Sequence, residues 1–155
     1  MPAESLQERY APRSTCFGCG PANANGLRIR SVVEGDDVVL EWRPAPHHEA
    51  FPGALSGGVI GALFDCHMNW TAAYRFMRRD GLDRPPATVT ASYEVRFVRT
   101  TPAAGTVRIL ARVVEEHPDR ATVEARLEAG GAVCATGRGT FVAVSPGHPA
   151  YHRWD

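Results

Sequence analysis

One long helical segment, followed by strand segments with short connections, is the feature that most limits how this chain can fold. Over residues 56–79, apolar side chains recur at helical offsets, which predicts a helix buried along one side. Parallel strands would need crossover helices between them, and the later connections are too short for that. We therefore expect an antiparallel sheet with one helix packed across it. The strands predicted after the helix are 88–97, 106–115, 121–128 and 132–144.

The segment 88–97 has the clearest strand pattern, because its apolar and polar residues alternate with a period of two. The apolar series is Val89, Ala91, Tyr93, Val95 and Phe97, and the polar series is Thr88, Thr90, Ser92, Glu94 and Arg96. Such alternation predicts a half-exposed strand with the two series on opposite faces.

Two further strands, 27–33 and 38–42, are predicted before the helix as a hairpin around Glu34-Gly-Asp-Asp37. The helix is expected to end at Arg78-Arg79-Asp80-Gly81. The polar segments 1–15 and 145–155 read as a flexible N-terminal arm and a C-terminal tail. A single α+β domain is then expected over 16–144.

The balance of charge argues against two classes of partner. Lys plus Arg and Asp plus Glu each number 17, so we expect neither a nucleic-acid nor an anionic-membrane partner. The apolar run at 59–64 is too short to span a membrane. Cys16, Cys19, Cys66 and Cys134 follow no apolar signal segment, which favours a reducing cytoplasmic location.

A glycine pair at the predicted start of the helix indicates a place for developing negative charge. Gly57 and Gly58 lie where unpaired backbone N–H groups would point outward, and the helix dipole favours an anion there. In an ideal helix Asp65 would lie about 12 Å beyond Gly57 along the axis, and the two residues would differ by only roughly 80° around that axis. A thioester-sized group could therefore contact both.

Several other residues permit a structural interpretation. Cys16 and Cys19 have the spacing of a zinc knuckle, but no second pair completes four ligands, so we favour a packing role and expect no metal. His67 within the helix is more typical of a core histidine than of a catalyst. The adjacent His47 and His48 are more typical of a solvated loop.

A set of motifs resembles a known family: Cys16-Phe-Gly-Cys-Gly20, Asn25-Gly-Leu27, Gly53-x-x-x-Gly-Gly58, Leu63-x-Asp65, and Phe97-x-Arg99 with Gly105. From about residue 16 to residue 144 the chain resembles the hotdog-fold acyl-CoA thioesterases of the phenylacetate-degradation (PaaI-like) type, in the 4-hydroxybenzoyl-CoA thioesterase superfamily. The resemblance implies a curved antiparallel sheet of about six strands wrapped round one long central helix. It also implies a homodimer or homotetramer with active sites at the interface.

The resemblance also implies roles for individual residues. The amide of Gly57, beside that of Gly58, would bind the thioester carbonyl, and Asp65 would act either as nucleophile or as general base on water. Asn69, one turn further on, would orient the water or the carboxylate. Arg99 and Arg138 are the residues expected to bind the phosphates of coenzyme A.

The chain departs from the family pattern at three places. Ser56 stands where a histidine usually precedes the glycine pair, and its hydroxyl can cap the helix but cannot carry a positive charge. Ala50 lies near a position that is often Asn or His, and His48 and Glu49 just upstream are candidates to replace that polar group. Cys66 stands where the neighbour of the catalytic acid is often Glu.

These observations predict an acyl-CoA thioesterase that releases a free acid and coenzyme A, with no cofactor beyond the coenzyme A of its substrate. A non-catalytic hotdog module that binds acyl-CoA or an acyl carrier is the alternative. A hydratase would need a paired His and carboxylate, and His67 does not share a helix face with Asp65 because the two are two residues apart.

Overall fold

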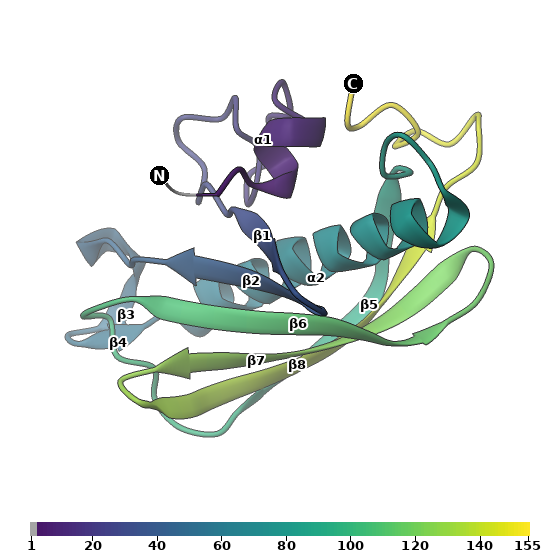
Figure 1. The fold of residues 1–155 in the computed structure, drawn as a ribbon. Coiled ribbons are helices and arrows are strands. Elements are labelled where there is room, and N and C mark those ends of the chain that lie inside the picture. Colours follow the sequence, from purple (N-terminus) through teal and green to yellow (C-terminus); the bar gives the residue numbers. More distant parts are fainter. Residues whose placement is uncertain (1–2) are drawn as a thin grey trace.

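The computed structural model describes residues 3–155, in which a curved antiparallel sheet wraps around one long helix (Figure 1). The helix is α2 (Gly57–Asp80), and the six-stranded sheet has the order β1-β2-β6-β7-β8-β5. Its strands are β1 (Ser31–Glu34), β2 (Asp37–Trp42), β5 (Thr88–Phe97), β6 (Val107–Glu116), β7 (Arg120–Ala129) and β8 (Ala132–Ala143). The shorter elements are α1 (Leu6–Tyr10), the 3₁₀ helix η1 (Pro46–His48), and β3 (Glu49–Phe51) paired with β4 (Ala54–Leu55). The predicted α+β architecture is confirmed.

The predicted element bounds agree closely with the structure except at the first strand. That strand was expected from residue 27 but begins at Ser31. Arg28 has a φ of 59°, which interrupts the extended backbone before the strand. The backbone N–H of Leu27 donates to Phe17 O at 2.9 Å, and that of Ile29 donates to Gly18 O at 3.0 Å. Residues 27–30 therefore pair with the preceding loop instead of extending β1.

The turn between β7 and β8 shows why two consecutive glycines are needed there. Gly130 and Gly131 both have positive φ, 59° and 80°, and they join Ala129 to its strand partner Ala132. Two positive φ values in succession characterise the tight turn whose twist matches that of the flanking strands. Gly130 and Gly131 thus form the tight turn that joins β7 to β8.

The core lies between α2 and the concave face of the sheet. Leu63, Phe64 and Met68 on the helix are fully buried. A Cβ atom added at Gly137 of β8 would lie 2.6 Å from Cδ1 of Phe64, so the helix approaches this strand too closely for any side chain. The Phe64–Gly137 contact therefore fixes how the helix sits on the sheet.

His67 is part of a buried hydrogen-bond chain. Its Nε2 lies 2.9 Å from Val38 O, which can only accept, so Nε2 carries the proton. Its Nδ1 then accepts from Ser31 Oγ at 2.8 Å, and Ser31 Oγ accepts from Gln7 Nε2 at 2.9 Å. Burial lowers the pKa of His67 to about 4. The ring is a neutral core group, as the sequence interpretation had it.

The N-terminal segment is more ordered than the expected flexible arm. Met1 and Pro2 lie outside the described residues, but within 3–15 the chain forms α1, where Ser5 and Glu8 make a capping box. Gln7 is fully buried and accepts from the backbone N–H of Ser31 at 2.7 Å. Packing of α1 on the domain therefore overrides the polar composition of this segment.

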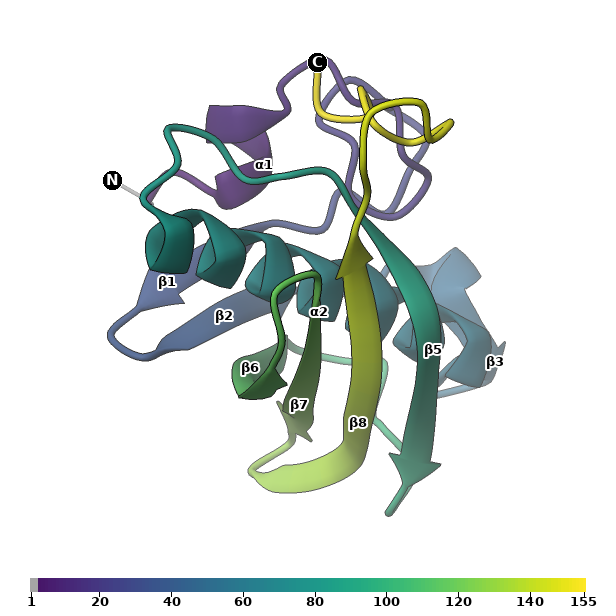
Figure 2. The ribbon, with the colours of Figure 1, turned by 90° about the vertical axis from the view of Figure 1, so that its right-hand side faces the viewer.

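The C-terminal segment also folds back over the domain, and Figure 2 shows it beside the N-terminal segment, beyond the end of β8. Trp154 is 4% exposed, and its ring centroid lies 4.4 Å from that of Trp70 on the helix. The indole N–H of Trp154 donates to Pro86 O at 3.0 Å, and Arg153 Nη1 donates to Thr88 O at 2.8 Å. The expected tail is thus anchored beside the start of β5.

Replacing Gly137 with Ala should destabilise the fold by about 1–3 kcal/mol, because the added methyl group would overlap the Phe64 ring. Urea unfolding at equilibrium would measure the change. Gly61→Ala is the matched control, because a Cβ there would lie 3.5 Å from the Tyr93 hydroxyl, an ordinary contact. That substitution should stabilise the helix by up to about 1 kcal/mol. Equal stabilities for the two variants would contradict the packing described.

Candidate active site

The start of α2 presents unpaired backbone amides to the surface. Ser56 is the N-cap residue with φ −61° and ψ 133°, and its own N–H donates to His48 O at 2.9 Å. The first hydrogen bond of the helix runs from Ile60 N–H to Ser56 O at 3.0 Å. The N–H groups of Gly57 and Gly58 precede that bond, and both glycines are exposed. Within residues 3–155 the Ser56 hydroxyl makes no capping bond, so both amides remain accessible.

Asp65 is half-buried two helical turns further on and is held by a threonine of the edge strand. Thr90 Oγ1 donates to Asp65 Oδ1 at 2.6 Å. Burial raises the pKa of Asp65, while the Thr90 hydrogen bond lowers it. Smaller effects come from Cys16, which raises the pKa, and from Arg153, which lowers it. The carboxylate is thus oriented through one oxygen and remains partly accessible.

The exposed glycines and Asp65 lie on the side of α2 that faces β5. Gly57, Gly61 and Asp65 follow one another at intervals of four residues, which places them along one helix face. Cβ atoms added at Gly57 and Gly61 would lie 3.4 Å from Phe97 Cζ and 3.5 Å from the Tyr93 hydroxyl, respectively. The helix start and the carboxylate therefore share one side of the helix, as the sequence predicted.

A bulge in β5 explains why both Thr90 and Tyr93 face the helix. Thr90 pairs with Phe141 and Ser92 pairs with the adjacent Thr140, so Ala91 is an extra residue in the strand. Strict alternation had placed Thr90 and Tyr93 on opposite faces, and that prediction is wrong. The sequence carries no clear signal for this bulge, which is why Thr90 was not recognised as a partner of Asp65.

Asn69 lies one turn beyond Asp65 but is used elsewhere. Its side chain is buried, and Nδ2 donates to Thr88 O at 3.4 Å. Its Oδ1 has no hydrogen-bond partner within residues 3–155. The amide is thus turned toward the start of β5, where Arg153 Nη1 also contacts Thr88 O.

His48 and Glu49 brace the loop that precedes the helix. His48 Nδ1 accepts from the backbone N–H of Ala45 at 2.9 Å, and its ring centroid lies 4.9 Å from that of Trp42. Burial lowers the pKa of His48. Glu49 Oε2 accepts from Gly53 N–H at 2.6 Å. These internal bonds hold the chain leading into Ser56.

The two arginines expected at the phosphates of coenzyme A lie in different places. Arg99 lines a hollow of about 360 Å³ beside Gly57 and Phe97. Arg138 lies on β8 next to Gly137, and because Gly137 faces the helix, Arg138 faces away from it and forms an ion pair with Glu124. Within one chain, only Arg99 is brought to the helix start.

Comparison with solved structures decides the type of fold. A thioesterase superfamily protein from Shewanella loihica PV-4 is 26% identical, with 81% of this chain and 98% of that chain covered and a TM-score of 0.65. This chain has the hotdog fold of the thioesterase superfamily. Zebra fish thioesterase superfamily member 2 shares that fold at 19% identity and a TM-score of 0.62, covering 79% of this chain and 90% of that one.

A Bacillus halodurans protein solved with CoA also shares the hotdog fold, at 22% identity and a TM-score of 0.61, with 77% of this chain and 76% of that chain covered. Neither a family model nor a curated protein sequence matches the chain. None of the helices within residues 3–155 is long and apolar enough to cross a membrane. The likeness to these hotdog structures extends over most of the chain.

Asp65→Asn should leave the hotdog fold at least as stable as the unmodified protein. The amide oxygen can still accept from Thr90, while the cost of burying a charge is removed. We expect a melting temperature that is unchanged or higher by up to about 4 °C. Calorimetry would measure it, with Asp83→Asn at an exposed position as the control. A clear decrease would mean that the carboxylate stabilises the fold.

Proposed function

We propose that the chain is an acyl-CoA thioesterase that hydrolyses an acyl- or aryl-CoA thioester to a free acid and coenzyme A. The observation that supports this most directly is the position of Asp65, half-buried on the same side of α2 as the exposed amides of Gly57 and Gly58. A hotdog fold in which these two groups share one face suits attack on a bound carbonyl.

In the proposed reaction, the thioester carbonyl oxygen accepts a hydrogen bond from the amide of Gly57 at the helix start. Negative charge that develops on this oxygen is stabilised by the amide and by the helix dipole. The free amide of Gly58 lies next to it, and the backbone N–H of Ser56 holds the preceding loop by donating to His48 O. Oxyanion donors of this kind contribute about 3–4 kcal/mol to transition-state stabilisation.

Asp65 drives the cleavage in either of two ways. As a general base it takes a proton from water while the water oxygen attacks the carbonyl carbon, and it returns that proton to the departing thiolate as the C–S bond breaks. As a nucleophile its carboxylate oxygen attacks the carbonyl carbon, and an anhydride forms as the C–S bond breaks and the coenzyme A thiolate leaves. Water then hydrolyses the anhydride, which releases the acid and restores the carboxylate. The raised pKa of Asp65 suits proton transfer, and the Thr90 bond to Oδ1 leaves Oδ2 for the reacting group.

The remaining expected contacts are part of the proposal. Arg99, beside the hollow at Gly57, would bind a phosphate of coenzyme A. Asn69 would act on the water or carboxylate only after its amide turned from Thr88. No resident cofactor is required, because coenzyme A is part of the substrate.

All four cysteines are free, which supports a reducing cytoplasmic location.

We also propose that the active unit is a homodimer or a dimer of dimers. β5 is the last strand in the sheet order, and an edge strand of this length can pair with a second copy. Tyr93, Phe97 and Val98 on and after it are 43%, 57% and 58% exposed. Pairing at β5 would place the face carrying Gly57 and Asp65 at the interface.

The first test is release of free thiol from a panel of acyl- and aryl-CoA esters. Asp65→Asn should lower kcat about 10²–10⁴-fold, because the group that transfers the proton or attacks the carbonyl is lost. Asp83→Asn should leave kcat unchanged. Full activity of Asp65→Asn would disprove the assigned role. Acyl-CoA binding without hydrolysis by the unmodified protein would favour the non-catalytic module.

Thr90→Val should lower kcat by about tenfold with little change in KM. The substitution removes one hydrogen bond to the carboxylate, which is worth about 1.5–3 kcal/mol when one partner is charged, and part of this is expected in the rate. Thr136→Val is the control, because Thr136 neighbours Gly137 and lies on the opposite face of the sheet. Steady-state kinetics on the best ester would measure both. An unchanged kcat for Thr90→Val would show that Asp65 needs no orientation by this hydroxyl.

A further inference from the structure

Three cysteine thiols that the proposed thioester chemistry does not use lie together where the N-terminal loop crosses α2. Cys16 and Cys19 come from the loop and Cys66 from the helix. Their sulfur atoms all lie within 4.8 Å of one another, and Cys16 Sγ is 3.9 Å from Cys66 Sγ. Cys19 is buried and the other two are half-buried, so the cluster is close to the surface.

The spacing of these sulfurs suits ligands around a single ion. Zinc–sulfur bonds of about 2.3 Å in a tetrahedral arrangement place sulfurs about 3.8 Å apart. A disulfide instead requires about 2.05 Å between its sulfurs. The observed 3.9 Å between Cys16 and Cys66 therefore needs little adjustment to hold an ion.

The loop around Cys16 holds two of the three thiols, Cys16 and Cys19, on one short turn. Gly20 N–H donates to Cys16 O at 2.9 Å and closes the turn. This turn keeps the Cys16 and Cys19 sulfurs on the side of the loop that meets Cys66.

Glycine at position 18 lets the helix sulfur reach the loop. A Cβ atom at Gly18 would lie 2.3 Å from Cys66 Sγ, so any side chain there would displace this sulfur or the loop. The Cys16–Cys19 turn and Cys66 are distant in sequence, and the absence of a side chain at position 18 allows them to pack together.

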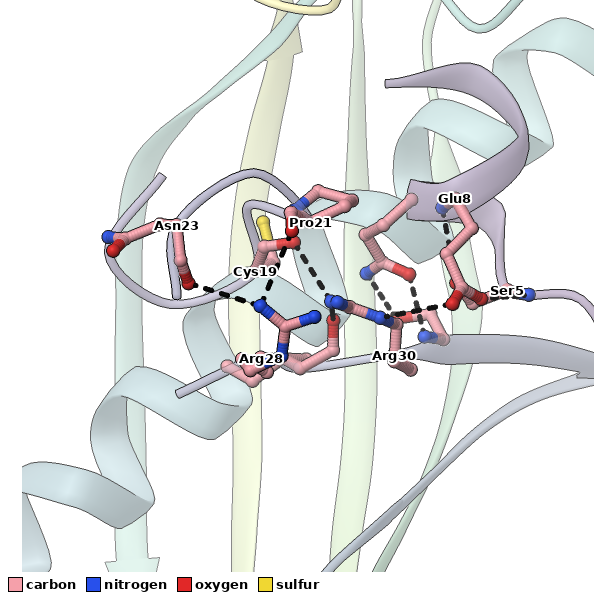
Figure 3. A network of polar contacts seen from close by, with 10 residues as sticks. Ser5, Glu8, Cys19, Pro21, Asn23, Arg28 and Arg30 are labelled. Carbon is pink, nitrogen blue, oxygen red and sulfur yellow. Dashed lines mark hydrogen bonds and ion pairs between the residues drawn. The ribbon is translucent and has the colours of Figure 1, made fainter. Parts of the chain in front are cut away.

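Polar contacts hold the loop in this position, as Figure 3 shows. Arg28 Nη1 donates to Pro21 O at 3.3 Å, and Arg30 Nη1 donates to Cys19 O at 3.4 Å. Arg30 also forms an ion pair of 3.7 Å with Glu8 on α1. The loop is therefore anchored to α1 and to its own backbone independently of the three thiols.

Three sulfurs gathered this closely are the ligand type that a soft divalent cation prefers. A divalent ion bound by all three sulfurs would displace the thiol protons.

We infer that Cys16, Cys19 and Cys66 form a three-sulfur binding site for a thiophilic divalent cation such as Zn²⁺. Within residues 3–155 the cluster includes no His, Asp or Glu ligand, so the fourth position would hold water or an added thiol. A bound ion would connect the loop that carries Cys16 and Cys19 to α2 at Cys66, the residue after Asp65. The inference departs from the expectation of no metal, because Cys66 supplies a ligand that the sequence spacing did not reveal.

The test is metal binding by the fully reduced full-length protein. One Zn²⁺ per chain should be found by native mass spectrometry, with release of up to about three protons per ion. Co²⁺ should give thiolate-to-cobalt charge-transfer absorption. Cys66→Ser should weaken binding at least about 100-fold, because loss of a ligand exceeds the 10–100-fold cost of losing an outer contact. Cys16→Ser tests the same site if Cys66→Ser does not fold.

Cys134→Ser is the matched control, because Cys134 is buried outside the cluster and bonds only to backbone carbonyls. It should bind Zn²⁺ as the unmodified protein does. Absence of stoichiometric binding, or binding that Cys16→Ser and Cys66→Ser leave unchanged, would overturn the inference. A disulfide that forms among the three cysteines in the presence of Zn²⁺ would also overturn it. None of these outcomes depends on thioester hydrolysis.

Discussion

The contact between α2 and the concave face of the sheet determines where every other group of the site lies. Phe64 occupies the space that Gly137 leaves on β8, and this fixes the rotation of the helix about its axis. Each helical residue is turned by about 100° from the last, so Asp65 falls at the margin of the buried face. That position explains why burial raises the pKa of Asp65 while the carboxylate stays partly accessible.

The edge strand gives this half-buried carboxylate its specific environment. Because of the bulge at Ala91, Thr90 and Tyr93 both face the helix, and the Thr90 hydroxyl reaches Asp65. Burial and the charge of Asp65 in turn raise the pKa of Tyr93. A local irregularity of one strand thus converts a regular half-exposed surface into one that can orient a reactive group.

The terminal segments complete the other flank of α2. The chain from Gln7 through Ser31 to His67 forms a buried polar connection, while Trp154 stacks on Trp70. Asp65 and Cys66, although adjacent, therefore have different surroundings: one faces β5 and the other faces the cysteine loop. One turn of helix serves both the proposed thioester chemistry and the inferred cation site.

The sequence by itself determined the single helix, the antiparallel strands, and the placement of Gly57 and Asp65 on one helix side, because these follow from short-range periodicity and turn chemistry. The structure alone decided the Thr90 contact, the folding of both terminal segments onto α2, and the meeting of Cys66 with Cys16. These depend on a bulge or on packing between distant segments, whose energies arise only when those segments are brought together.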